Sequence, residues 1–135
     1  MTKKKYIETF NTVYEVDIVI ANINVTLKDL QKTYTYSDGV ELDEELLQSI
    51  ATTARCRNKL TNRYCVIVKY NKPNSIKGID KRADLINTAA HEALHTAMDL
   101  YSFIGEDVRP NDSNENLAYL VGWITEKIYQ VWTKK

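Results

Sequence analysis

The chain has little of several residue types on which common folds and functions depend. It has two cysteines, and its eighteen basic and eighteen acidic residues cancel. Without a net charge, no field over the whole molecule attracts nucleic acid or an anionic membrane. No apolar run approaches membrane-spanning length, and the segment after the basic start is too polar for a signal peptide. We therefore expect a cytoplasmic protein with no nucleic-acid partner and no membrane partner.

The scarcity of cysteine limits the role of disulfides. Cys56 and Cys65 stand on either side of a predicted turn, so a bridge is open to them, but free thiols are favoured without a secretory context. At 135 residues the chain is long enough to bury a core without disulfide or metal support. No repeat or linker divides it. We expect residues 1–135 to form one domain, in which a metal would be catalytic rather than structural.

Histidine is equally scarce, and the only two histidines stand together in His91-Glu92-Ala93-Leu94-His95. In a helix, residues four apart lie one turn above each other, so both imidazoles can bind one metal ion. Two neutral imidazoles suit Zn²⁺, and Glu92 beside them can take a proton from the water that attacks a polarised carbonyl. The motif therefore predicts metal-assisted amide hydrolysis. The plainer interpretation is a surface strip in which two histidines occur by chance.

The residues around the motif predict a helix over about 80–104 with two kinds of surface. One polar strip contains Asp84, Thr88, His91, Glu92, His95, Asp99 and Ser102. The remaining arc is apolar and contains Leu85, Ile86, Ala89, Ala90, Ala93, Leu94, Ala97, Met98, Leu100, Tyr101, Phe103 and Ile104. So wide an apolar arc predicts a buried helix whose polar strip faces a cleft. Asp99, one turn after His95, is either an acceptor for a ligand's N–H or a solvated residue.

Several segments before this helix have the composition of a small sheet. Residues 13–22 predict a central strand, and residues 24–36 fit either a short helix or an extended segment. A helix is expected over 42–51, where acidic residues precede apolar ones at helical spacing. Residues 52–57 and 63–70 predict a hairpin around a polar turn. The second arm is either a core strand or an edge strand that pairs with an extended peptide beside the cleft.

The last helix is predicted over 114–132. Its apolar face consists of Leu117, Leu120, Val121, Ile124, Ile128 and Val131. Glu115 lies in its first turn, where it could be the third ligand of a zinc site with two histidines and one carboxylate. The alternative role is structural, because with Asp112 as N-cap Glu115 would complete a capping box.

Here the sequence resembles the gluzincin metallopeptidases, the thermolysin-like group, in which HExxH is followed on a later helix by a glutamate ligand written Asn-Glu. The similarity rests on His91 to His95, Asp99 and Asn114-Glu115, in about the last third of the chain. The chain also resembles very small HExxH proteins encoded by phages and other mobile elements, where Glu-x-x-x-Tyr-Leu begins a closing helix. The resemblance implies a zincin-like fold, with His91, His95 and Glu115 as zinc ligands and Glu92 as general base.

The sequence departs from the thermolysin-like pattern at two points. One turn after the third ligand, those enzymes have an aspartate that orients a histidine ligand, and here that position is Tyr119. A further histidine that stabilises the tetrahedral intermediate cannot be present, since the chain has only two. Tyr101, Arg109 and Tyr119 are candidates for its role. Nothing in the sequence chooses among them, and we take Tyr119 as the candidate catalytic residue beside Glu92.

We expect an α+β, zincin-like domain in which a small twisted sheet packs against the HExxH helix and the C-terminal helix. The predicted function is a zinc-dependent peptidase that acts on a peptide or protein substrate. The alternative is a non-catalytic zinc-binding structural or interaction protein of phage or mobile-element origin. Missing transition-state stabilisers favour the alternative, whereas Glu92 favours the enzyme, because a structural two-histidine site does not need it. Substrate preference and oligomeric state do not follow from the sequence.

Overall fold

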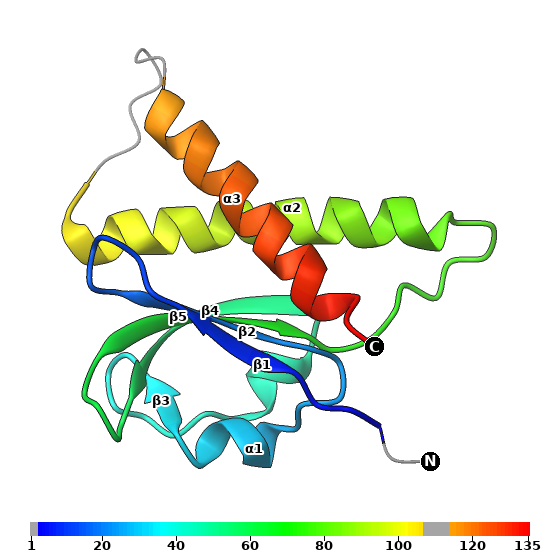
Figure 1. The fold of residues 1–135 in the computed structure, drawn as a ribbon. Helices are drawn as coiled ribbons and strands as arrows, with labels where there is room; N and C mark the ends of the chain where they lie inside the picture. Colours follow the sequence, from blue (N-terminus) through cyan, green and yellow to red (C-terminus); the bar gives the residue numbers. More distant parts are fainter. Residues whose placement is uncertain (1–2, 107–113) are drawn as a thin grey trace.

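A five-stranded sheet with the order β1-β2-β5-β4-β3 lies at the centre of the computed structural model, which describes residues 3–106 and 114–135. The strands are β1 (Ile7–Phe10), β2 (Asp17–Ala21), β3 (Tyr34–Tyr36), β4 (Ala51–Asn58) and β5 (Tyr64–Tyr70). Helices α2 (Lys81–Ile104) and α3 (Glu115–Trp132) cover one face of the sheet, and α1 (Leu27–Gln31) and the 3-10 turn η1 (Glu44–Leu47) lie on the other (Figure 1). The expected α+β class is confirmed.

The central strands β2 and β5 are buried because elements cover both faces of the sheet. They run parallel, with Ile18 opposite Val66 and Ile20 opposite Val68. Alternate side chains of a strand point to opposite faces, so the sheet has two cores. These four residues pack beneath α2 and α3. The intervening side chains pack against α1, β3 and η1. A continuous apolar run such as that of β2 is therefore the pattern of a strand covered on both sides.

The hairpin predicted over 52–70 is present as β4 and β5, which pair antiparallel. Because β5 lies between β2 and β4, it is a core strand, and the expectation that it could be an edge strand is wrong. Residues 24–36, left open between two structures, contain both, since α1 is followed by β3. The strand expected over 13–22 begins only at Asp17, and β1 was not anticipated.

The helix expected over 42–51 is shorter than predicted, because only η1 forms and Ala51 already begins β4. Asn71 gives the physical reason. Its side-chain amide donates to the carbonyl oxygens of Leu46 (2.9 Å) and Ser49 (3.0 Å), which a longer helix would need for its own hydrogen bonds. A tertiary contact from the end of β5 therefore replaces the helix that local composition favours.

Helix α2 follows the prediction closely in its bounds but not in its burial. The Asp80 side chain accepts a hydrogen bond from the Ala83 amide (2.9 Å), and Gly105 ends the helix in the left-handed conformation, with φ 73°. Only a stripe of the helix is buried. Ile86, Leu94 and Met98 are 46%, 46% and 47% exposed, so the expectation that the whole apolar arc is buried is wrong. The sheet and α3 leave the outer side of α2 uncovered.

Helix α3 is buried mainly in its second half. Ile124, Ile128 and Val131 are fully enclosed, whereas the predicted core residues of the first half are only partly buried. Trp132 anchors the end of the helix, because its indole N–H donates to the Ala21 carbonyl (3.1 Å) and its ring stacks on Tyr70. The first half extends past α2, away from the sheet (Figure 1). No helix in the described ranges is long and apolar enough to cross a membrane.

Candidate metal centre

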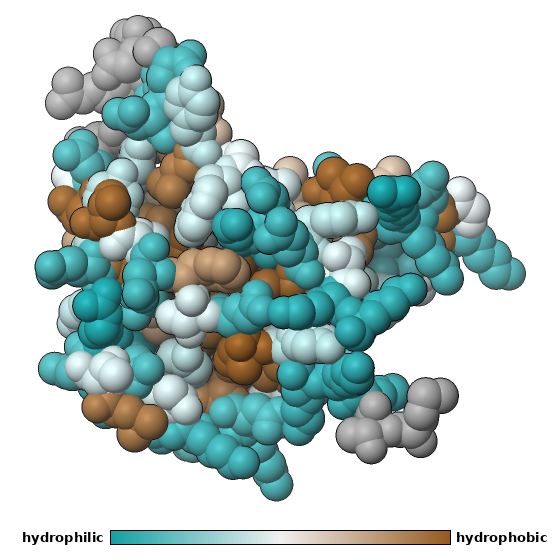
Figure 2. All heavy atoms as spheres, viewed as in Figure 1, coloured by the Kyte–Doolittle hydropathy of each residue, from teal (hydrophilic) through white to brown (hydrophobic). Residues whose placement is uncertain are grey.

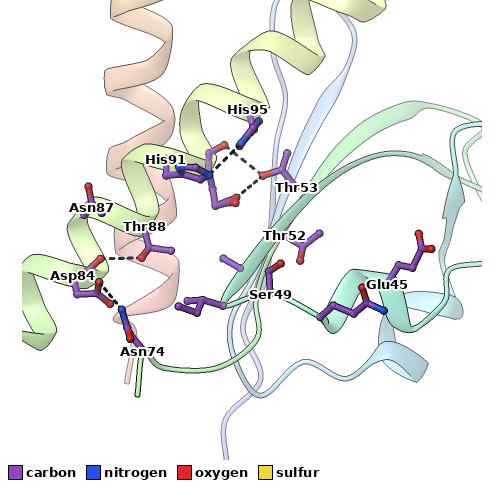
Figure 3. Close-up of a pocket in the computed structure, with 14 residues that line it drawn as sticks. Glu45, Ser49, Thr52, Thr53, Asn74, Asp84, Asn87, Thr88, His91 and His95 are labelled. Atoms are coloured by element: carbon purple, nitrogen blue, oxygen red, sulfur yellow. Dashed lines mark hydrogen bonds between the residues drawn. The ribbon is translucent and has the colours of Figure 1, made fainter. Parts of the chain in front are cut away.

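His91 and His95 lie on the exposed side of α2, in the middle of the helix. Their Nε2 atoms are 3.2 Å apart, and their rings meet edge to face with centroids 4.8 Å apart (Figure 3). Zinc holds imidazole nitrogens at about 2.0–2.1 Å, so two of them in a tetrahedral arrangement are roughly 3.3 Å apart. The two nitrogens are within hydrogen-bond distance of each other, and the same separation fits a zinc ion bound by both, with the donor types that zinc prefers.

Glu92 lies next to the histidines but points more toward the sheet, and it is only 5% exposed. The Thr53 hydroxyl, which comes from β4, donates to its Oε2 at 3.2 Å (Figure 3). Burial raises the pKa of the Glu92 carboxyl above its ordinary value, while His91, the Thr53 hydrogen bond and His95 each oppose that rise. The carboxylate is thus held in one place beside the histidines, with a raised affinity for a proton.

A cleft of about 590 Å³ lies between α2 and the sheet. The α2 wall consists of Asp84, Asn87, Thr88, His91, Glu92 and His95. The opposite wall is formed by η1, the turn after it and the start of β4, from Glu45 to Thr53, and Asn74 lies at one end (Figure 3). The prediction that the polar strip faces a cleft is therefore confirmed for its central residues.

The start of β4 is a free sheet edge beside this cleft. β3 pairs with β4 only over residues 56–58, so residues 51–54 have no strand partner on that side among the described residues. The Ser37 amide donates to the Arg55 carbonyl (3.0 Å), so the main chain of Arg55 points away from β5. Residues two apart along a strand point their main-chain groups the same way, so those of Thr53 face the open edge as well.

Asp99 contacts the sheet, and its expected role as an acceptor for a ligand's N–H stays a prediction. Its carboxylate faces Arg55 of β4, with Oδ1 3.9 Å from the guanidinium Nε, and the same guanidinium donates to the Ser102 hydroxyl at 3.1 Å. Burial raises the pKa of Asp99, and Arg55 and His95 act against that rise. Asp99 therefore helps to fasten the second half of α2 to β4.

The structure does not bring Glu115 to the histidines. Glu115 is the first residue of α3, at the end that stands away from the sheet, and no three His, Cys, Asp or Glu side chains in the described ranges form a group able to hold a metal ion (Figure 1). The capping-box alternative also fails, because Asn114 occupies the N-cap position and Glu115 is N1. Asp112, the N-cap expected from the sequence, lies outside the described residues.

Tyr119 and Tyr101, two of the three candidates for a transition-state stabiliser, do not line the cleft. Tyr119 is 76% exposed and lines a different hollow, of about 360 Å³, beside Trp123 and the turn before β2. Tyr101 is not among the residues that line the cleft, and Arg109 lies outside the described residues. Thr53, which does contact Glu92, was missed, because a threonine at the start of a predicted strand carries no specific signal.

Comparison with models of protein families, with curated protein sequences and with solved structures gives no match for this chain. The function is therefore inferred from the residues that line the cleft.

Proposed function

We propose that this chain is a zinc-dependent peptidase with a zincin-like fold, in which an HExxH helix lies beside the free edge of a sheet. The observation that carries the proposal is the placement of a buried glutamate, fixed by Thr53, next to two histidines whose nitrogens have the separation of zinc ligands. Zinc bound there would polarise the carbonyl of a peptide bond and make an attacking water more acidic.

Each side chain has a distinct task in this proposal. His91 and His95 hold the metal. Glu92 takes the proton of the attacking water and passes it to the leaving nitrogen, as a general base and then a general acid. The hydrogen bond from Thr53 keeps the carboxylate of Glu92 in one orientation. The burial that raises its pKa also makes it a stronger base than an exposed carboxylate.

The neighbouring sheet edge supports a peptide or protein as the substrate class. An extended chain can add to a free edge through main-chain hydrogen bonds, which do not depend on its sequence. The outward-facing amide and carbonyl of Thr53 offer these bonds within the cleft. We therefore assign to the start of β4 the peptide-pairing role that we first considered for β5.

One set of observations favours the second candidate, a zinc-binding structural or interaction protein without turnover. Glu115, the third ligand that the resemblance implied, and Tyr119, the candidate catalytic residue, lie apart from the histidines. A structural zinc-binding protein does not need Glu92. Burial of a carboxyl group against Thr53 costs free energy and does not by itself stabilise the fold. For this reason the peptidase remains the better proposal, together with a cytoplasmic location.

The test replaces Glu92 by Gln, which keeps the shape of the side chain and removes its basicity. Because Glu92 is not a ligand in this proposal, zinc affinity should change little, while turnover should fall by ~10²–10⁴-fold. His91→Ala should remove both zinc binding and turnover. Zinc affinity can be measured by competition with a chromogenic chelator, and turnover with a broad peptide library and mass-spectrometric detection.

Glu126→Gln is the matched control, since Glu126 is exposed on α3 and lies outside the cleft. It should match the wild type in both measurements. If the wild type binds zinc but cleaves no peptide in the library, the non-catalytic candidate becomes the better account. Cleavage at the wild-type rate by Glu92→Gln would show that Glu92 is not the base.

A further inference from the structure

The two histidines supply only half of a tetrahedral metal shell. Structural zinc sites have four protein ligands, and catalytic ones have three. In the described part of the chain no third His, Cys, Asp or Glu joins His91 and His95. Glu92, the nearest carboxylate in sequence, is turned toward Thr53 on the buried side of the helix. Zinc bound by this pair therefore has positions open to ligands from outside the described residues, and both imidazoles are exposed to them.

An apolar surface adjoins the histidines on the same exposed side of α2. Leu94 follows His91 by three residues and Met98 follows His95 by three, and residues at this spacing are neighbours on a helix surface. Both side chains are nearly half exposed. Figure 2 shows apolar atoms among hydrophilic ones along the part of α2 that this view leaves uncovered. A metal at the histidine pair would thus lie at the border of a surface that favours contact with another protein.

We propose that one zinc ion joins two copies of this chain by binding His91 and His95 of each copy. A two-fold axis through the metal brings the same residues from both sides, as an isologous interface requires, and four imidazoles complete a tetrahedral shell. The same axis places Leu94 and Met98 of one copy against the α2 surface of the other. The occupant of this surface is therefore a second copy of the chain.

The charge of the molecule permits this contact. The formal net charge is zero, so two copies do not repel each other as a whole. Imidazoles bind zinc in their neutral form, so the paired histidines add no charge of their own to the interface. The apolar patch is small compared with a stable protein interface, so we expect association to depend on the metal.

The inference rests on the metal-binding half of the proposed function and not on the hydrolytic half. In the joined form all four ligand positions are filled, so it is a resting form. Excess zinc separates the copies, because each histidine pair can then hold a metal ion of its own. Hydrolysis would belong to that separated form, in which water and substrate could take the positions that the histidines leave open.

The test is a titration of metal-free protein with zinc, followed by sedimentation velocity. The 15.6 kDa monomer should double in mass as zinc is added, reach the largest dimer fraction at about one zinc per two chains, and return toward the monomer in excess zinc. Co²⁺ in place of zinc gives an independent measure, because its tetrahedral complexes absorb strongly and report the stoichiometry directly.

Substitutions distinguish the contribution of the metal to the dimer from that of the apolar surface. His91→Ala and His95→Ala should each abolish the dimer. Leu94→Asp should weaken it, by placing two carboxylates in the interface, whereas Leu60→Asp, at an exposed position in the turn between β4 and β5, should leave it unchanged. Glu92→Gln should also dimerise like the wild type, because Glu92 is not a ligand.

A monomer at every zinc ratio, saturating at one zinc per chain, would overturn this inference and leave the peptidase proposal intact. A zinc-dependent dimer without turnover under excess zinc would support the inference and overturn the peptidase. A chain that binds no zinc would overturn both. A dimer that persists in His91→Ala would show that the surface associates without the metal, and would also overturn the inference.

Discussion

At the residue scale, the helix itself separates the ligands from the base. Consecutive residues are turned by about 100° around a helix axis, so Glu92 cannot share the direction of His91. The structure uses this offset, since the histidines are exposed whereas Glu92 reaches Thr53 on the sheet. The pentapeptide therefore needs a position at the edge of a cleft, where the histidines are open to solvent and Glu92 reaches the sheet. The same five residues on a fully buried or a fully exposed helix would lose one of the two roles.

The cysteines give a prediction at the same scale. Cys56 and Cys65 face each other across β4 and β5, and both are buried free thiols, as the sequence favoured. Burial raises the pKa of Cys65 to about 12 and also raises that of Cys56. Since the thiolate is the reactive form, a disulfide reagent at pH 8 should modify neither cysteine in the folded protein and both in urea. Absorbance of the released thiol measures this.

Fast modification of one cysteine under native conditions would contradict this prediction, because it would require the hairpin to open locally. The matched control is Cys65→Ala, which should leave one reactive thiol in urea and none in buffer.

At the scale of elements, α3 is not equally important along its length. Ile128, in its second half, is fully enclosed by the core beneath α2 and α3, whereas Leu120, in its first half, is only partly buried. The cost of removing a side chain grows with the cavity left behind. The second half of α3 therefore contributes most of the stability that the helix adds, and the first half tolerates change.

This gradient can be measured with two substitutions. Ile128→Ala should lower the free energy of unfolding by ~2–5 kcal/mol, and Leu120→Ala should lower it by less than about 2 kcal/mol, because its site can relax toward solvent. Urea denaturation gives both values. Equal losses would mean that the first half of α3 is packed as tightly as the second.

At the scale of the whole molecule, the C-terminal residues connect α3 to the strands formed by the start of the chain. The Tyr6 hydroxyl donates to the Lys135 carbonyl at 2.9 Å, and Lys134 forms an ion pair with Glu8 at 2.6 Å. Trp132 reaches the main chain of β2. Residues at the end of α3 therefore close the sheet face together with residues from β1 and β2. Contacts so distant in sequence make folding of the complete chain cooperative.

Removal of α3 should therefore prevent the rest of the chain from folding. A fragment of residues 1–113 exposes the core under Ile124 and Ile128, so we expect it to aggregate or to lack a cooperative unfolding transition. A chain that ends at Thr133 is the matched control, since it keeps Ile128 and Trp132 in the core and loses exposed contacts, of Lys134 with Glu8 and of Lys135 with Tyr6, so it should still unfold cooperatively. Circular dichroism during urea titration distinguishes them. A soluble fragment of residues 1–113 that unfolds cooperatively would show that the rest of the fold does not need α3.

The sequence predicts the candidate site only for residues that are close together in the chain. His91, Glu92 and His95 share one helical turn and a half, so their mutual placement follows from helix geometry. Glu115 was assigned from a resemblance and Tyr119 as a candidate for a missing stabiliser, and the distance of both from the histidines depends on how α3 crosses α2. Spacing along a chain does not determine such a crossing, because the connecting loop permits several directions.

By itself the sequence determined the α+β class, the bounds of α2, the hairpin of β4 and β5, and the exposure of a histidine pair to a cleft. These features follow from short-range periodicity and capping. Only the tertiary structure decided which strand borders the cleft and which residue holds Glu92. It also decided that Lys69, charged in an otherwise apolar strand, is fully buried, with its ammonium donating to the Asn22 carbonyl at 3.1 Å. These outcomes depend on pairing and coverage between segments distant in sequence, where many small packing energies together outweigh local preference.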